Sequence, residues 1–321
     1  MTRLEKETNV EDFDDFGTRL RASASRLNAA LSVRYPGLDP VKLPLLSRTK
    51  RLLLREPVSP HLSEGLLRLI IFGSPFASSE RLPGQARLPL QPAAEVVSPY
   101  LLMRFNNIIN KATARRLLNC YVEMEALGLK TSHAEAHWST TSALHAGVWS
   151  LYQKMPYVTR DTRSQPSAVT EVLARMLGII AKEVAPKLVK LLKEHCPEQW
   201  ARLQRAYDRV KTIMWEVYGE KPWLDFEGAF FTVAVKQGSS KILHLDWNDD
   251  KCGGITWVIP VGRWEGGEFC SPQLKACIPV AQGQALGVQA RRLVHCGAPA
   301  KGTRVVFMLF ADHTLLKQAE Q

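Results

Sequence analysis

The spacing of apolar residues changes near Gly219. Before it, apolar residues recur every three or four positions, as amphipathic helices require. This spacing occupies 15–33, 59–73, 103–128, 167–195 and 197–219. Pro186 falls inside the fourth stretch, so we expect that helix to stop or restart there. The first 219 residues are therefore predicted to be largely helical.

After Gly219, short runs rich in β-branched and aromatic residues alternate with Gly, Pro and polar turns, which is typical of strands. The runs occupy 228–236, 241–247, 254–262, 267–272, 275–280, 284–289, 291–297 and 303–312. Many short strands with this punctuation predict a sandwich or barrel. The chain thus reads as a helical part followed by a compact β part.

A stretch rich in Pro, Gly and Ser between residues 74 and 99 predicts a surface connection. We therefore divide the chain into three segments. Residues 1–97 form a helical and basic extension, residues 98–219 a helical support, and residues 220–321 the β core.

Composition narrows the class of protein. Of 321 residues, 45% are hydrophobic, and no apolar run approaches the roughly 20 residues that span a bilayer. The first 17 residues are polar and acidic, which argues against a secretory signal. We expect a soluble intracellular protein with no membrane partner, whose six cysteines, without CxxC spacing, are reduced thiols.

The positive charge is unevenly distributed. The formal net charge is +11, yet residues 220–321 hold 11 Lys and Arg against 10 Asp and Glu, so the excess lies upstream. The segment 42–57 is especially basic, with Lys42, Arg48, Lys50, Arg51 and Arg55. Such a stripe suits a phosphate backbone, an acidic partner or a membrane surface, but a solvated helix face explains it equally well.

The stretch "KILHLDWNDDKCGG" carries the first candidate chemistry. In an extended chain, residues two apart project from the same face, so His244 and Asp246 point the same way. A third ligand must come from a distant strand, and His295, 51 residues on, is the best candidate. Two imidazoles and one carboxylate form the facial triad that leaves positions open on Fe(II).

Arg304 opens the apolar run "TRVVFMLF" nine residues after His295. A guanidinium at the start of a buried strand needs a carboxylate, because an unpaired buried charge is costly. A dicarboxylate co-substrate such as 2-oxoglutarate would supply one, as a bidentate pair. Taken singly, an HxD motif can arise by chance and a lone histidine can be a core residue; the combination is much more specific.

The order "HLD … GGEF … GQALGV … VHCG … GTRVVFMLF" resembles the double-stranded β-helix core of Fe(II)/2-oxoglutarate-dependent dioxygenases, over roughly residues 220–315. It is most similar to the TET/JBP branch of nucleic-acid base oxygenases, especially its short fungal and protist members. The resemblance implies an α+β fold: a double-stranded β-helix (jelly-roll) core preceded by a largely helical N-terminal part.

The same resemblance implies base-reading residues. In that branch the residue three after the ligand Asp hydrogen-bonds the flipped base, and here it is Asp249, with Asn248 and Asp250 as possible helpers. A base-contacting histidine about eight residues after the arginine is also expected; His313 stands at plus nine and Asp312 at plus eight. This departure of one residue separates the chain from the family pattern.

Other candidates have structural alternatives. His133, His137 and His145 cluster in sequence, but they lack the carboxylate and cysteine neighbours of a zinc site, and we do not expect them to bind metal. Trp247, Trp257 and Trp264 are expected to pack in the core, although one could stack on a base.

The sequence therefore predicts an Fe(II)/2-oxoglutarate dioxygenase that oxidises a methylated base in duplex DNA, 5-methylcytosine before N6-methyladenine. Its metal ligands are His244, Asp246 and His295, and Arg304 anchors the co-substrate. A prolyl-hydroxylase-like protein oxygenase and an inactive DNA-binding barrel remain open. We further expect a monomer located in the nucleus, with DNA, 2-oxoglutarate and dioxygen as partners.

Overall fold

The structure, a computed structural model, describes residue 100 and residues 102–131, 143–150, 155–240, 244–246, 248–250, 252, 254–271 and 276–319. The helices predicted over 15–33 and 59–73 lie outside these residues, and so do the basic segment 42–57 and the pair His133 and His137.

A seven-stranded antiparallel sheet forms the centre of the molecule, in the order β1-β8-β5-β10-β4-β2-β3. Its strands are β1 (Leu102–Phe105), β2 (Leu144–Trp149), β3 (Tyr157–Val158), β4 (Thr232–Gln237), β5 (Thr256–Gly266), β8 (Ala285–Val288) and β10 (Ala300–Phe310). A second sheet has the order β7-β6-β9, from β6 (Phe269–Ser271), β7 (Ala276–Ile278) and β9 (Cys296–Gly297). This mixed architecture is consistent with a jelly roll.

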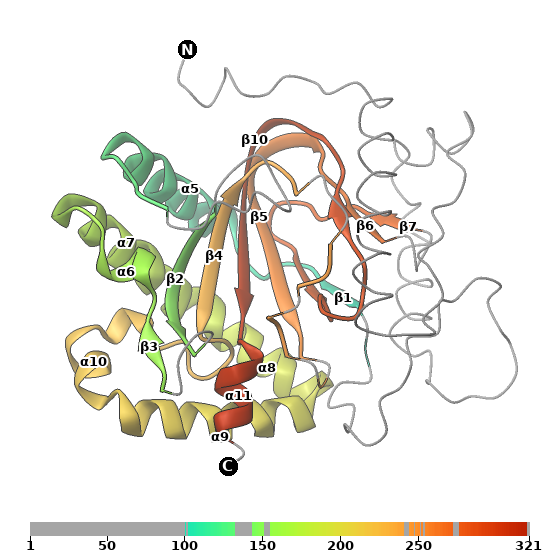
Figure 1. The fold of residues 1–321 in the computed structure, drawn as a ribbon. Helices are drawn as coiled ribbons and strands as arrows, with labels where there is room; N and C mark the ends of the chain where they lie inside the picture. Colours follow the sequence, from blue (N-terminus) through green and yellow to red (C-terminus); the bar gives the residue numbers. More distant parts are fainter. Residues whose placement is uncertain are drawn as a thin grey trace, which may run out of the picture.

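Helices cover one side and one end of the large sheet, while β6 and β7 lie on the other side (Figure 1). They are α5 (Lys111–Ala126), α6 (Arg160–Arg163), α7 (Ser167–Ile179), α8 (Ala185–His195), α9 (Pro197–Ile213), α10 (Trp215–Glu220) and α11 (His313–Ala319). No helix in the described part of the chain has the length and apolar character that a bilayer crossing requires.

The helical segment predicted over 103–128 begins instead as a strand. Residues Leu102–Phe105 form β1, and α5 starts at Lys111, where the Asn110 side chain accepts a hydrogen bond from the Thr113 backbone N–H at 2.8 Å. Such a cap satisfies one of the free N–H groups of a first helical turn. The interruption predicted at Pro186 is confirmed, because a π-helical segment, Ile180–Val184, separates α7 from α8.

The strand predictions after Gly219 are confirmed in outline, with one difference. His244 and His295 pair only through an isolated bridge, and β9 is limited to Cys296–Gly297. The expected strands around both histidines are therefore shorter than their apolar patterns suggest, and after His244 the chain forms only a second isolated bridge, between Asp249 and Asp312.

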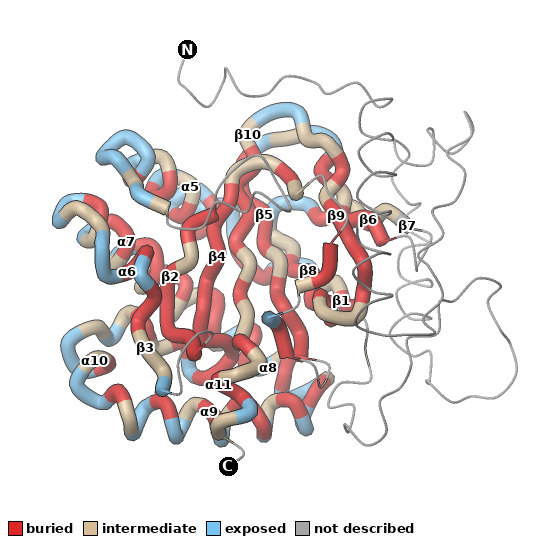
Figure 2. The backbone as a smooth tube through the Cα atoms, in the orientation of Figure 1, coloured by how far each residue is buried: buried red, intermediate tan, exposed pale blue. Residues whose placement is uncertain are grey.

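The two faces of the large sheet differ in what they bury. On β10, Val305, Phe307 and Leu309 pack into the main apolar core, which includes residues of α5, α7 and α8. The alternate residues Arg304, Val306, Met308 and Phe310 line a cavity on the opposite face. This division follows from the period of two in strands. Figure 2 shows the strands buried almost throughout.

The cysteines differ from the sequence-based expectation of six reduced thiols. A disulfide joins Cys270 of β6 to Cys277 of β7, while Cys120, Cys196, Cys252 and Cys296 do not form disulfides. The pairing arises because β6 and β7 place these two residues directly opposite each other. That register is a tertiary feature that cysteine spacing alone does not reveal.

Candidate metal centre and its cavity

Two candidate ligands are held together by their own backbones. The His244 N–H donates to the His295 carbonyl at 2.9 Å, and the His295 N–H donates to the His244 carbonyl at 3.0 Å. Residues paired in this way lie directly opposite and project their side chains from the same face. The 51-residue separation along the chain is thus closed by one antiparallel bridge.

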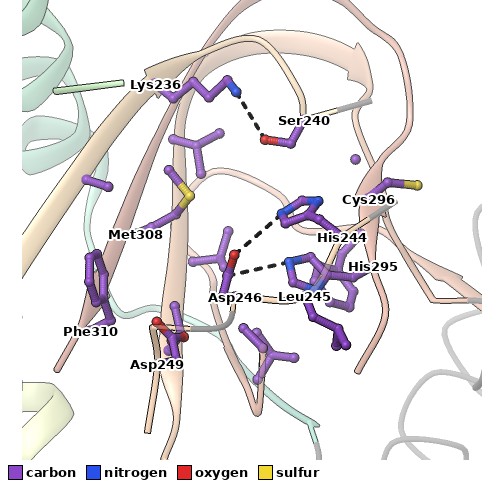
Figure 3. A pocket seen from close by; sticks show the side chains of 18 of the residues that line it. Lys236, Ser240, His244, Leu245, Asp246, Asp249, His295, Cys296, Met308 and Phe310 are labelled. Carbon is purple, nitrogen blue, oxygen red and sulfur yellow. Dashed lines mark hydrogen bonds and ion pairs between the residues drawn. The ribbon is translucent and has the colours of Figure 1, made fainter. Parts of the chain in front are cut away.

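Asp246 completes the predicted triad. Its carboxylate oxygens lie 3.6 Å from His244 Nε2 and 3.7 Å from His295 Nε2, and one ligand atom from each residue falls within 4.8 Å of the others. Figure 3 shows both imidazoles directed at this carboxylate inside the cavity. Among the described residues this is the cluster of His, Cys, Asp and Glu that could hold a metal ion.

The surroundings orient the His295 ring. Its Nδ1 lies 2.8 Å from the Leu293 carbonyl oxygen, which requires Nδ1 to carry the proton and leaves the Nε2 lone pair for a metal. The Phe269 ring stacks on the imidazole, with centroids 5.0 Å apart and planes 20° apart. Burial raises the pKa of the Asp246 carboxyl, while His295 and His145 oppose that shift.

The donor set fits a divalent first-row metal, and Fe(II) in particular. Two neutral imidazoles and one carboxylate on one side of an ion leave the remaining positions open. The cavity provides space for ligands at those positions, with a volume of about 390 Å³. A site of this size and mixed polarity is typical of small-molecule binding.

Arg304 projects into the same cavity. It is 6% exposed, and its Nη1 donates to the Gly238 carbonyl at 2.7 Å and to Ser239 Oγ at 3.4 Å. Its Nε is buried without a hydrogen-bond partner, and no ion pair joins it to a carboxylate of the described residues. Burial lowers the pKa of the guanidinium to about 10 and nearby Glu268 opposes this, so the group stays charged at neutral pH.

Gly267, in the "GGEF" motif, makes room for this guanidinium. A Cβ at position 267 would lie 2.9 Å from Arg304 Nε, and the residue adopts a φ of +72°, which favours glycine. The guanidinium also lies over the Trp264 ring, with its Cζ 5.7 Å from the ring centroid. A buried cation with an unpaired donor next to open space fits a ligand carboxylate, as predicted for 2-oxoglutarate.

Asp249 lies at the edge of the cavity and is 6% exposed. Thr256 Oγ1 donates a hydrogen bond to its Oδ2, and Arg291 donates to its backbone carbonyl at 2.8 Å. Within the described part of the chain, Oδ1 has no hydrogen-bond partner. Burial, followed by the neighbouring Asp246 charge, raises the pKa of this carboxyl well above its usual range.

The other proposed base-reading residues separate into two groups. Asn248 is exposed and lines the cavity beside Asp249. Asp250 instead points toward α9, where it forms a buried ion pair with Arg202, and it lies 3.8 Å from His313 Nδ1. The His313 ring therefore sits behind the turn and does not line the cavity, whereas Asp312, at plus eight, does.

The carboxylate of Asp312 is hydrogen-bonded to backbone N–H groups. Its side chain accepts hydrogen bonds from the N–H groups of Ser150 and Leu315, both at 2.9 Å. It therefore caps α11 and ties it to the end of β2. The position eight residues after Arg304, where the resemblance predicted a base-contacting histidine, is therefore an acidic helix cap.

Several cavity residues were not predicted from the sequence, among them a histidine, a tryptophan and a lysine. His145 and Trp149 come from β2, and Lys236 comes from β4. Lys236 is 2% exposed and donates to Ser240 Oγ at 3.2 Å. The signal that could have found them is the period of two, since His145 pairs with Ala234, which itself pairs with Met308, on the cavity face.

Of the three tryptophans expected to pack in the core, Trp257 is confirmed in that role, while Trp264 is half-buried. Trp257 is fully buried in the main core, 6.1 Å from the Phe105 ring. Trp264 lies beside Arg304, and Trp247 is outside the described residues.

Three solved structures are similar to this chain. NgTET1 in complex with 5mC DNA shares 15% identity, with 67% of this chain and 73% of that chain covered and a TM-score of 0.47. The viral collagen prolyl hydroxylase of Paramecium Bursaria Chlorella virus-1 shares 14%, with 65% and 94% covered and a TM-score of 0.31. A prolyl hydroxylase from Trichoplax adhaerens shares 12%, with 68% and 86% covered and a TM-score of 0.34.

Because these TM-scores lie below 0.5 and the identities do not exceed 15%, the similarities establish neither a family nor a substrate. No family model matches the sequence, and no curated protein matches it. The chemical assignment therefore depends on the geometry of the cavity, where three candidate metal ligands and a buried cation occur together.

Proposed function

We propose that this protein is an Fe(II)- and 2-oxoglutarate-dependent dioxygenase, with a double-stranded β-helix core, that oxidises a methylated base in DNA. The observation that carries the proposal is the placement of His244, Asp246 and His295 in one cavity with the buried guanidinium of Arg304. We propose 5-methylcytosine as the preferred base, oxidised to 5-hydroxymethylcytosine and further, and the nucleus as the location.

Different residues of the chain would bind the iron and the far end of the co-substrate. His244, Asp246 and His295 would hold the iron, and Arg304 would pair with the far carboxylate of 2-oxoglutarate. When bound, the iron and co-substrate would supply the oxidation, in which dioxygen and 2-oxoglutarate give succinate and carbon dioxide and one oxygen atom is inserted into a C–H bond of the methyl group. The protein supplies orientation and a site that excludes water.

An apolar wall opposite the metal ligands separates the expected co-substrate end of the cavity from the expected base end. Val306, Met308 and Phe310 alternate along β10 from Arg304 toward the cavity rim. They separate the charged anchor from the end of the cavity where Asp249 lies. An extruded base needs such a pocket, with an aromatic or apolar wall and a polar group for its Watson–Crick edge.

Asp249 is the residue we assign to that edge. Thr256 occupies one of its carboxylate oxygens and fixes the side-chain orientation, which leaves Oδ1 for a ligand. As a carboxylate it would accept from the exocyclic amino group of cytosine or adenine. Asn248, exposed at the same rim, is placed to assist, and the basic upstream segment 42–57 would contact phosphates.

A direct test compares substrates. The full chain is incubated with Fe(II), 2-oxoglutarate and a duplex that contains 5-methylcytosine, N6-methyladenine or no methyl group, and separately with a prolyl peptide. Succinate is measured together with the nucleosides, by mass spectrometry. We expect succinate formation to depend on methylated DNA, with 5-hydroxymethylcytosine as the first product.

The Asp246→Ala variant is the control, because it removes one metal ligand from a half-exposed position without opening the core. Turnover that depends on the prolyl peptide would replace the DNA assignment with a protein oxygenase. DNA binding without succinate under any condition would contradict an enzymatic role.

A further inference from the structure

Three cysteines lie in one row across the small sheet. Cys270 of β6 is paired in register with Cys277 of β7 on one side and with Cys296 of β9 on the other. Directly opposed residues in antiparallel strands project from the same face. The three side chains therefore share one face of the sheet, and the disulfide between Cys270 and Cys277 belongs to this row.

The opposite face of the same strand touches the candidate metal centre. Phe269, one residue before Cys270, stacks on the His295 ring at 5.0 Å. Figure 3 shows the Cys296 sulfur directed away from the two imidazoles, as the alternation requires. Strand β6 thus carries a disulfide on one face and the ring that supports a metal ligand on the other.

We propose that the Cys270–Cys277 pair is a redox-responsive modification site, open to thiol and disulfide reagents, that controls metal binding through Phe269 and His295. The inference rests on the proposed function, because it requires the triad to bind a metal. Both β6 and β7 are three residues long, too short for an independently stable hairpin. Pairing with β9 and the apolar cluster around Phe269 also hold β6, and the disulfide adds a covalent constraint between β6 and β7.

The chemistry needs only a thiol reductant or a small disulfide oxidant. Cys277 is half-buried and Cys270 is 7% exposed, so a reagent reaches the sulfur of Cys277 first. A dithiol attacks that sulfur, the Cys270–Cys277 bond breaks, and Cys270 leaves with the electron pair and takes a proton. The second thiol of the reagent then closes on the first and releases Cys277, so two electrons pass to the protein. Oxidised glutathione reverses the process by the same exchange.

Reduction is expected to weaken metal binding. Loss of an outer-shell support of a ligand typically lowers metal affinity by about 10- to 100-fold, and here the support is loosened rather than removed, so we expect about three- to tenfold. The reduced and oxidised forms should differ at the metal site while the main core, on the far side of the large sheet, stays unchanged.

The experiment titrates the full chain with Co(II), followed by its visible absorption, after treatment with oxidised glutathione or with dithiothreitol and anaerobic desalting. Mass spectrometry after thiol alkylation counts the free cysteines, four in the oxidised form as in this structure. Cys277→Ser removes the disulfide at a half-buried position. Cys120→Ala, on α5, is the matched control that leaves the disulfide intact.

We expect the Co(II) dissociation constant to rise on reduction in the wild type and in Cys120→Ala. Cys277→Ser should show the raised value in both states, and Phe269→Leu should reduce the difference. Equal dissociation constants in both states of the wild type, or a response that persists in Cys277→Ser, would overturn the redox site alone. Absence of Co(II) binding in either state would overturn the metal centre itself.

Discussion

The two faces of β10 show how one strand serves two purposes. Val305, Phe307 and Leu309 are at most 1% exposed and join the core beneath the helices. Their neighbours Arg304, Val306, Met308 and Phe310 face the cavity. One face therefore contributes apolar burial to stability, and the other holds a charge and open space that cost stability and serve binding.

From this comparison we expect that the effect of a substitution on β10 depends on the face of the strand from which the side chain projects. Changes on the cavity face should affect metal, co-substrate or substrate binding while the protein stays folded. Changes on the core face should lower the free energy of unfolding without changing the chemistry. The following predictions test this division, beginning with the largest expected effect.

His244→Ala should abolish turnover, since two remaining ligands hold a divalent ion poorly. His244 is only 7% exposed, but its side chain borders the cavity. Its truncation would therefore enlarge an existing cavity and create no new one in the core. We expect turnover to fall below detection and the thermal unfolding midpoint to stay close to that of the wild type. Retained turnover would remove the triad from the mechanism.

Arg304→Ala should raise the 2-oxoglutarate concentration needed for half-maximal decarboxylation about 30-fold or more, because a buried charge pair contributes about 2–5 kcal/mol. Arg304→Lys is the matched variant, as it keeps the charge but loses the fork of donors. The 2-oxoglutarate concentration that Arg304→Lys requires should lie between those of the wild type and Arg304→Ala. An unchanged requirement in Arg304→Ala would contradict the anchoring role.

Asp249→Ala should reduce base oxidation about tenfold more than it reduces decarboxylation without DNA, since a base-edge contact is worth about 1–3 kcal/mol. Asp249→Asn keeps an acceptor for Thr256 and replaces the second carboxylate oxygen with an NH2 donor, so it isolates the contribution of that oxygen. Both products are measured in the same reaction, as succinate and hydroxymethylated nucleoside. Equal losses of the two would show that Asp249 does not read the base.

Adjacent valines on β10 allow the sharpest comparison of the two faces. Val305→Ala should lower the free energy of unfolding by about 2 kcal/mol, from lost burial and the cavity left behind. Val306→Ala should lower it by less than about 1 kcal/mol, because its side chain already borders open space. Urea denaturation measures both. Equal losses of unfolding free energy in the two variants would mean that the two faces of β10 contribute equally to stability.

The smallest effect concerns the turn behind Asp249. Burial alone would raise the pKa of Asp250, but His313 and Arg202 outweigh it, so the pKa lies below its ordinary value. The ion pair therefore stabilises the fold above the unfolded pKa of about 3.9, and this stability is lost as pH falls through the lower folded pKa.

Accordingly, the free energy of unfolding of the wild type should fall more steeply below about pH 4 than that of Asp250→Asn. The measurement is urea denaturation at several pH values between 7 and 3. Parallel profiles for the two proteins would indicate that Asp250 has the same pKa in the folded and unfolded chains.

Many of the candidate site residues could be predicted from their spacing along the sequence. His244 and Asp246 are two apart, and the "GGEF" glycine proved to be the residue that makes room for Arg304. Asp250 was less accessible to sequence reasoning, because its partner Arg202 lies 48 residues upstream, on α9. The cavity position of His145 was missed because its strand, β2, lies in a stretch that was not recognised as β.

By itself, the sequence determined the ligand types, their spacing along each segment, and the alternation that puts apolar and functional residues on opposite faces of a strand. Those properties depend on neighbours within a few positions, where backbone geometry alone decides which side chains point together. Tertiary structure decided which segments meet. It paired His244 with His295, turned Asp250 and His313 behind the rim, and brought His145 into the cavity. Strand register is chosen by the packing of the whole sheet, since shifting one residue would exchange the two faces.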